Sequence, residues 1–193
     1  MNLQDYKDVY VFAEQRDGKI QNVALELLGK ARELADANNE KVVAMLLGKN
    51  IKGEAQTLVA HGADRVLVVD HDLLATYLTE PYTQAITQII KECKPSIMLI
   101  GATTIGRDLG PRVSARNLTG LTADATKLEI SDDEAHELRM TRPAFGGNLM
   151  ATILCKNHRP QMSTVRPGVM QMMAADPNRM GEIVDYSVQF DEK

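Results

Sequence analysis

The stretch LIGATTIGRDLGPRVSAR, residues 99–116, decides the fold because it joins an apolar run to a helical pattern. The run IMLIGA (97–102) is typical of a buried strand, and the residues that follow it, through Arg116, predict a helix. The turn between them lies at the carboxyl end of the strand, which is the edge where open parallel sheets bind ligands. Backbone N–H groups at the helix start would favour an anion or an electron-rich ring edge there.

Within this stretch GATTIGRD almost matches the phosphate-binding loop pattern G-x-x-x-x-G-K-[ST]. Gly101 and Gly106 have the required separation, but Arg107 stands where the loop needs a lysine. Asp108 stands where the loop needs a hydroxyl, and a carboxylate there would face the phosphates. The sequence therefore predicts a turn of this shape that is not a phosphate-binding loop.

Two interpretations of the turn remain open. In the first, Arg107, Arg112 and Arg116 form the polar face of an ordinary helix, and Asp108 pairs with Arg112 four residues along. In the second, a tight turn lets a ligand or a partner backbone approach closely, because glycine has no Cβ. The residues of that candidate turn are Thr103, Thr104, Gly106 and Arg107.

Short β-branched runs alternate with helical patterns before this stretch, which is typical of βαβ units and a parallel sheet covered on both faces. We expect strands at DVYVFAE (8–14), KVVAMLL (41–47), RVLVVD (65–70) and IMLIGA (97–102). We expect helices at 22–37 with Asn22 as a cap, at 54–60, at 81–91 with Pro81 in the first turn, and through Arg116.

After Gly120 extended segments follow one another without helices: TKLEI (126–130), HELRMTR (136–142), LMATILC (149–155) and QMSTVR (161–166), joined through SDDEA (131–135) and KNHRP (156–160). Some of these could extend the sheet as antiparallel strands. The predicted fold is α/β, a doubly wound, mostly parallel, Rossmann-like sheet with helices on both faces and added antiparallel strands in the C-terminal third. Residues 1–175 form one domain, and 176–193 a linker or terminal strand.

Composition excludes several classes of function. The 193 residues fit one domain, and a formal net charge of −4 offers no broad positive field for nucleic acid. Cys93 and Cys155 lack C-x-x-C spacing, so we expect structural thiols in a reducing cytoplasm. No signal peptide and no apolar run near the ~20 residues of a membrane span is present. We expect a soluble, bacterial-type cytoplasmic protein.

Signatures of catalysis are missing from the sequence. It contains no G-x-S-x-G elbow, no H-E-x-x-H and no G-x-G-x-x-G after the first strand. The four histidines, His61, His71, His136 and His158, lie in turn-like or polar contexts without ligand spacing, so we expect surface groups and no metal site. The chain is therefore not expected to be an enzyme.

TRPAFGGN, residues 141–148, is costly for a plain strand, because glycine weakens strands and proline removes a ladder donor. One interpretation is a β-bulge or a corner between strands. The other is that Arg142 presents its guanidinium on a stiff backbone to an electron-rich partner.

Four motifs in order, VYVFAEQRDGKI (9–20), LIGATTIGRDLGPRVSARNLTGLTADATKLEI (99–130), TRPAFGGNLMATI (141–153) and MSTVRPGVM (162–170), resemble the alpha subunit of an electron transfer flavoprotein. The resemblance implies a heterodimeric FAD electron carrier, formed with a beta subunit, that serves flavoprotein dehydrogenases of the acyl-CoA type. It also implies that a second, FAD-binding domain would follow, so we expect a fragment that holds the first domain and lacks the main FAD site.

TRPAFGGN is also similar to the form in the electron-bifurcating branch of that family, which uses NADH and carries a second FAD on the beta subunit. That resemblance implies that Arg142 lies over the flavin ring, with Phe145, Gly147 and Asn148 also at the cofactor. A fixed cation beside the ring favours the anionic reduced flavin, and about 1.4 kcal/mol moves a two-electron couple by about 30 mV.

Two alternatives from other classes remain. A nucleotide-binding module of the universal-stress type would need G-x-x-G, nine residues and G-[ST] late in the sheet, and the sequence has no such loop. An interaction scaffold would only pack against a partner, through an exposed apolar face.

Overall fold

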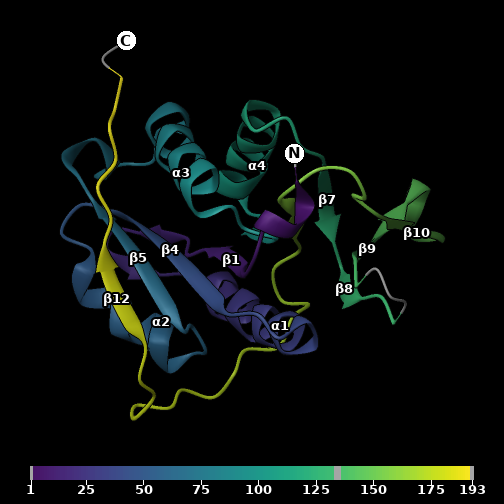
Figure 1. The fold of residues 1–193 in the computed structure, drawn as a ribbon, viewed down its shortest axis with the longest axis horizontal. Coiled ribbons are helices and arrows are strands. Elements are labelled where there is room, and N and C mark those ends of the chain that lie inside the picture. Colours follow the sequence, from purple (N-terminus) through teal and green to yellow (C-terminus); the bar gives the residue numbers. More distant parts are fainter. Residues whose placement is uncertain (1, 133–135, 192–193) are drawn as a thin grey trace.

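A seven-stranded, entirely parallel sheet forms the centre of the computed structural model, which describes residues 2–132 and 136–191 (Figure 1). The strands lie in the order β12-β5-β4-β1-β6-β11-β7. Their bounds are β1 (Val9–Phe12), β4 (Val42–Gly48), β5 (Arg65–Asp70), β6 (Ile97–Gly101), β7 (Leu121–Ala125), β11 (Gln161–Val165) and β12 (Glu182–Asp185).

Helices cover both faces of this sheet, as predicted (Figure 1). Alternate residues of a strand point to opposite faces, so Val9 and Val11 of β1 pack under α1 and α2, whereas Tyr10 and Phe12 pack under α3 and α4. Burial on both faces explains why these strands are continuous apolar runs. The helices are α1 (Asn22–Asn38), α2 (Ala55–Ala60), α3 (Thr79–Cys93) and α4 (Thr104–Arg116), and short 3-10 turns are Leu3–Asp5, Lys52–Glu54 and Asp72–Leu74.

The predicted α/β class is confirmed, and the helix starts need small corrections. Gln21, not Asn22, is the residue before α1, and its side chain makes no capping hydrogen bond, so the expected Asn22 cap is wrong. Residue Glu54 belongs to a 3-10 turn, and α2 begins at Ala55. Pro81 lies in the first turn of α3, where its missing N–H costs nothing.

The C-terminal third differs from a simple extension of the sheet. QMSTVR supplies β11, which runs parallel to its neighbours and inserts between β6 and β7. The five residues of β7 were not among the expected strands. The antiparallel strands form a separate sheet, β10-β9-β8, that stands beyond β7 (Figure 1). Its strands are β8 (Lys127–Ile130), β9 (Leu138–Ala144) and β10 (Leu149–Ile153), and the expected connection at 131–135 lies partly outside the described residues.

Two further pieces complete the chain. A small hairpin of β2 (Gln15–Arg16) and β3 (Lys19–Ile20) follows β1. Near the other end β12 pairs in parallel with β5 at the edge of the main sheet. The last described residues then run along α3, where the Gln88 side chain accepts a hydrogen bond from the backbone N–H of Gln189 at 2.9 Å.

Candidate functional site

The strand order reverses between β1 and β6, which are neighbours in the sheet and lead into helices on opposite faces. A crevice at the carboxyl ends of such strands is the usual ligand site of an open α/β sheet. The turn after β6 lies at this edge, as the sequence predicts. The candidate site therefore lies at this edge of the sheet.

Side chains of the protein itself fill the crevice at the start of α4. The Thr103 hydroxyl accepts a hydrogen bond from the Gly106 N–H at 3.0 Å and donates one to the Glu14 carboxylate at 2.5 Å. Glu14 follows β1, is 1% exposed, and also accepts a hydrogen bond from the Arg16 guanidinium at 2.9 Å. A buried carboxylate is stable because both of its oxygens have donors. The helix start thus has an internal anion at the place where a phosphate would approach.

Gly106 is required by backbone packing. A Cβ on Gly106 would lie 1.7 Å from the carbonyl oxygen of Gly101, which no side chain tolerates. Within the candidate turn Thr103 and Gly106 are thus used inside the chain, whereas Thr104 and Arg107 are exposed. Arg107 turns back along the edge and donates from Nε to the Ala102 carbonyl at 3.0 Å.

Asp108 does not pair with Arg112, so that expectation is wrong. Its carboxylate accepts hydrogen bonds from the hydroxyls of Tyr77 and Thr79, each at 2.6 Å. These donors, Thr79 first, hold the pKa of Asp108 below its ordinary value. The partner lies in another segment because α4 packs beside α3, and the same packing pairs Arg116 with Glu80 at 2.8 Å.

Asp124, near the end of β7, interacts electrostatically with arginines from three segments at the same edge of the sheet. Arg166, directly after β11, donates from Nε at 3.2 Å and from Nη2 at 2.6 Å to its two carboxylate oxygens. Arg107 of α4 places Nη2 3.8 Å from Oδ1. The hydrogen bond from Arg166 is the main reason that the pKa of Asp124 is lowered, and the charges of Arg107 and Arg142 act in the same direction.

Arg142 comes from β9, which pairs with β8, the strand that directly follows β7. The Thr126 N–H donates to the Thr141 carbonyl at 2.9 Å, so the strand that carries Arg142 is fixed close to Asp124. Among the described residues Arg142 Nε is buried and has no hydrogen-bond partner. We call Arg107, Asp124, Arg142 and Arg166 the Asp124 cluster. It brings together the two stretches that the sequence singled out separately.

TRPAFGGN forms the corner between β9 and β10. Its Phe145–Gly147 portion is a 3-10 turn in which Gly146 and Gly147 have φ of 70° and 83°, values that glycine adopts without strain. Gly147 and Asn148 are exposed on this corner. The side chain of Phe145 lies outside what the structure describes. The predicted corner carries β10 outward, with Leu149 62% exposed and Met150 57% exposed.

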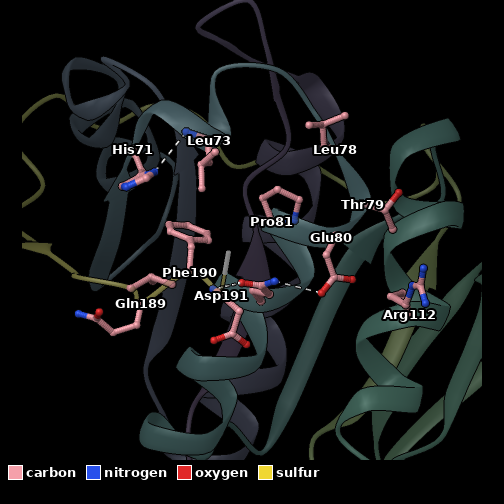
Figure 2. A pocket seen from close by; sticks show the side chains of 12 residues that line it. His71, Leu73, Leu78, Thr79, Glu80, Pro81, Arg112, Gln189, Phe190 and Asp191 are labelled. Atoms are coloured by element: carbon pink, nitrogen blue, oxygen red, sulfur yellow. Dashed lines mark hydrogen bonds between the residues drawn. The ribbon is translucent and has the colours of Figure 1, made fainter. Parts of the chain in front are cut away.

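A further cavity lies elsewhere, between the start of α3 and the last described residues (Figure 2). It encloses about 870 Å³ and its lining includes His71, Arg112 and Phe190. The Phe190 ring lies 4.6 Å from the His71 ring, and Asp191 N–H donates to Gln84 at 3.0 Å. The ring contact joins the tail to the loop after β5, and the hydrogen bond joins it to α3, so the cavity lies between these segments and is separate from the Asp124 cluster.

The remaining expectations concern metals, thiols and membranes. Among residues 2–132 and 136–191 no three carboxylate, thiol or imidazole side chains lie close enough together to hold a metal ion. Cys93 and Cys155 are both unpaired and half-buried. No helix in the described part of the chain has the length and apolarity that a membrane span requires. His71, His136 and His158 are exposed and His61 is half-buried.

A family model and individual relatives identify the same family for this chain. The family model "Electron transfer flavoprotein domain" matches residues 9–191. The chain is 53% identical over 190 residues, 98% of its length, to the electron transfer flavoprotein subunit alpha of Thermoanaerobacterium thermosaccharolyticum. It is 46% identical, over 88% of its length, to the acryloyl-CoA reductase electron transfer subunit beta of Anaerotignum propionicum. It is also 46% identical, over 83% of its length, to the lactate dehydrogenase (NAD(+),ferredoxin) subunit LctC of Acetobacterium woodii.

The matches cover only part of each relative: 57%, 52% and 38% of their respective lengths. The chain therefore spans about half the length of the curated relatives it matches. The residues matched by the family model, 9–191, span the turn after β6, the corner after β9 and the strand before Arg166. The chain belongs to the electron transfer flavoprotein family and corresponds to the amino-terminal domain of its alpha subunit.

Proposed function

We propose that this chain is the domain of an electron transfer flavoprotein alpha subunit that packs against a beta subunit and faces the flavin held there. The assembled heterodimer exchanges electrons with a flavoprotein dehydrogenase of the acyl-CoA type, and the chain itself catalyses no turnover. The observation that carries this function is the position of Arg142 on β9, opposite Ala151 in the middle of the exposed apolar strand β10. The family match favours this function over a nucleotide-binding module.

The residues at this edge fit a flavin. Arg142 has a buried Nε without a partner among the described residues, so its guanidinium retains donor capacity. Arg166 hydrogen-bonds to the carboxylate of Asp124, Arg107 lies 3.8 Å from it, and the charge of Arg142 acts on it from a greater distance, which leaves an excess of positive charge. FAD, when bound by the partner, supplies the acceptance and release of electrons. Arg142, with Gly147 and Asn148 beside it and Phe145 in the same turn, would orient toward the ring and favour its reduced, anionic form.

The β9–β10 hairpin supplies the packing surface. Leu149, Met150 and Ile153 of β10, and Leu154 directly after it, are all exposed by more than a third. Exposed apolar side chains gathered on one strand are typical of a surface that a partner covers. We therefore assign this strand to the contact with the beta subunit.

Co-elution with the beta subunit tests this assignment. Met150→Asp should abolish co-elution of the chain with an FAD-loaded beta subunit on a sizing column, because a charge would be buried in the contact. Met180→Asp is the matched control, since Met180 is 90% exposed and lies far from the hairpin, before β12. Loss of co-elution in both variants, or in neither, would contradict the assignment.

Three finer points belong to the same proposal. Residues 1–175 would form the functional domain, and 176–193 would lead toward a second, FAD-binding domain. The similarity to a lactate dehydrogenase (NAD(+),ferredoxin) subunit supports a role in flavin-based electron bifurcation with NADH. The bacterial relatives and the two unpaired cysteines support a bacterial cytoplasm as the location.

A further inference from the structure

Asp124 has a left-handed backbone conformation near the end of β7. Its φ is 60°, in the left-handed region that L-residues other than asparagine and aspartate rarely adopt. Its N–H donates to the Thr164 hydroxyl at 2.9 Å, and the Arg166 N–H donates to the Ala125 carbonyl at 3.0 Å. Aspartate tolerates this conformation, and the two hydrogen bonds fix Asp124 against the end of β11.

The carboxylate of Asp124 faces more positive charge than it neutralises. Its side chain is 27% exposed, and both oxygens are engaged by the fork of Arg166. Arg107 stands 3.8 Å from the same carboxylate, and the strand of Arg142 is fixed at the end of β7. Arginine cannot lose its proton at physiological pH, so the cluster keeps a fixed charge that only the carboxylate reduces.

We propose that Asp124 and Arg166 are positioning residues that set the net positive charge which Arg142 and its neighbours present to the flavin of the partner subunit. This inference rests on the proposed function. Asp124 pairs with Arg166 and Arg107 at the edge of the sheet near Arg142, and it lowers the combined charge of the three arginines by one. Arg166 supplies one of those charges and fixes the direction of the carboxylate. The negative charge of Asp124 thus lowers the reduction potential of the facing flavin, and the positive charge of Arg166 raises it.

Opposite shifts from the two members of the pair are the signature of this role. Asp124→Asn removes a negative charge and should raise the midpoint potential of the partner's flavin, because the anionic reduced form gains stability. Asparagine tolerates the left-handed backbone, so the variant should fold. Arg166→Gln removes a positive charge and should lower the potential. If the two residues only supported the structure, both variants would loosen the cluster and shift the potential in the same direction.

The experiment is a redox titration of the flavin in the complete two-subunit protein. At a fixed potential, each single variant should change the ratio of reduced to oxidised flavin about tenfold, which is about 30 mV for a two-electron couple, in opposite directions. The double variant should return close to the unmodified protein. Asp36→Asn is the matched control, because Asp36 also pairs with an arginine, Arg32, but lies at the far end of α1.

Failure of this inference can be told apart from failure of the proposed function. Shifts of the same sign, or no shift, in Asp124→Asn and Arg166→Gln would overturn the charge-setting role whatever Arg142 does. Arg142→Gln, measured in parallel, should lower the potential, and an unchanged potential there would contradict the proposed contact of Arg142 with the flavin. An unchanged potential in Arg142→Gln would contradict the inference as well, because Arg142 carries one of the charges of the cluster, whereas a lowered potential in Arg142→Gln without opposite shifts at Asp124 and Arg166 would overturn the inference alone.

Discussion

Removal of the Thr103 hydroxyl should destabilise the protein more than the loss of a helix cap alone. Thr103→Val keeps the shape of the side chain but removes the hydrogen bond with the Gly106 N–H and the 2.5 Å hydrogen bond to Glu14. Loss of an N-cap costs about 1 kcal/mol. A buried carboxylate that loses a donor costs about 2 kcal/mol more. The expected loss in the free energy of unfolding is therefore about 3 kcal/mol, a large share of the roughly 5–15 kcal/mol typical of a domain.

Urea denaturation followed by circular dichroism measures this loss. Thr103→Ser is the matched control, because it retains the hydroxyl and should cost less than about 1 kcal/mol. In a Glu14→Gln background the cost of Thr103→Val should fall by about 1 kcal/mol, since a hydrogen bond to a charged acceptor is about twice as strong as one to a neutral acceptor. Equal costs for the valine and serine variants would refute the proposal that Thr103 joins α4 to the carboxylate after β1.

Two further outcomes follow from individual contacts. Gly106→Ala should prevent folding or strongly lower the melting temperature in a thermal scan, because its Cβ would lie 1.7 Å from the Gly101 carbonyl oxygen. Gly53→Ala is the control and should have little effect, because a Cβ on Gly53 would meet open space. The Arg116 guanidinium, first among its partners, lowers the pKa of Glu80 from its ordinary 4.5 to about 2, so the stability from this pair is complete above pH 4.5 and is lost as the pH falls toward 2. Urea titrations at about pH 6 and about pH 3 should therefore show a smaller acid-induced loss for Arg116→Gln than for the unmodified protein, and an equal loss would contradict this sign.

The sequence predicted the main sheet well because its strands are buried on both faces. A short, continuous apolar run such as KVVAMLL is typical of a buried strand. The glycine and proline residues between such runs mark the ends of the elements. LTADA at β7 was missed because it mixes buried and exposed positions and contains Asp124. The order of strands could not be predicted from local pattern, because β11 inserts between β6 and β7, which precede it by many residues.

The candidate site was predicted in parts. Arg107 stood out because it follows Gly106, and Arg142 stood out because it precedes Pro143 and two glycines, residues that restrict or free the backbone. Asp124 and Arg166 gave no such local signal, since their partnership depends on the insertion of β11. Their positions within LTADATKLEI and MSTVRPGVM, two of the motifs that carry the family resemblance, were the available pointer. A contact between residues 42 positions apart requires the fold to be known.

The central claim is that this chain faces a flavin held by a partner subunit. The most direct test titrates the chain into an FAD-loaded beta subunit and follows the flavin absorbance spectrum, with the chain plus free FAD measured beside it. The account predicts a saturable spectral change at equal amounts of the two subunits and no tight FAD binding by the chain alone. An unchanged spectrum with the beta subunit present, or tight FAD binding without it, would contradict the account.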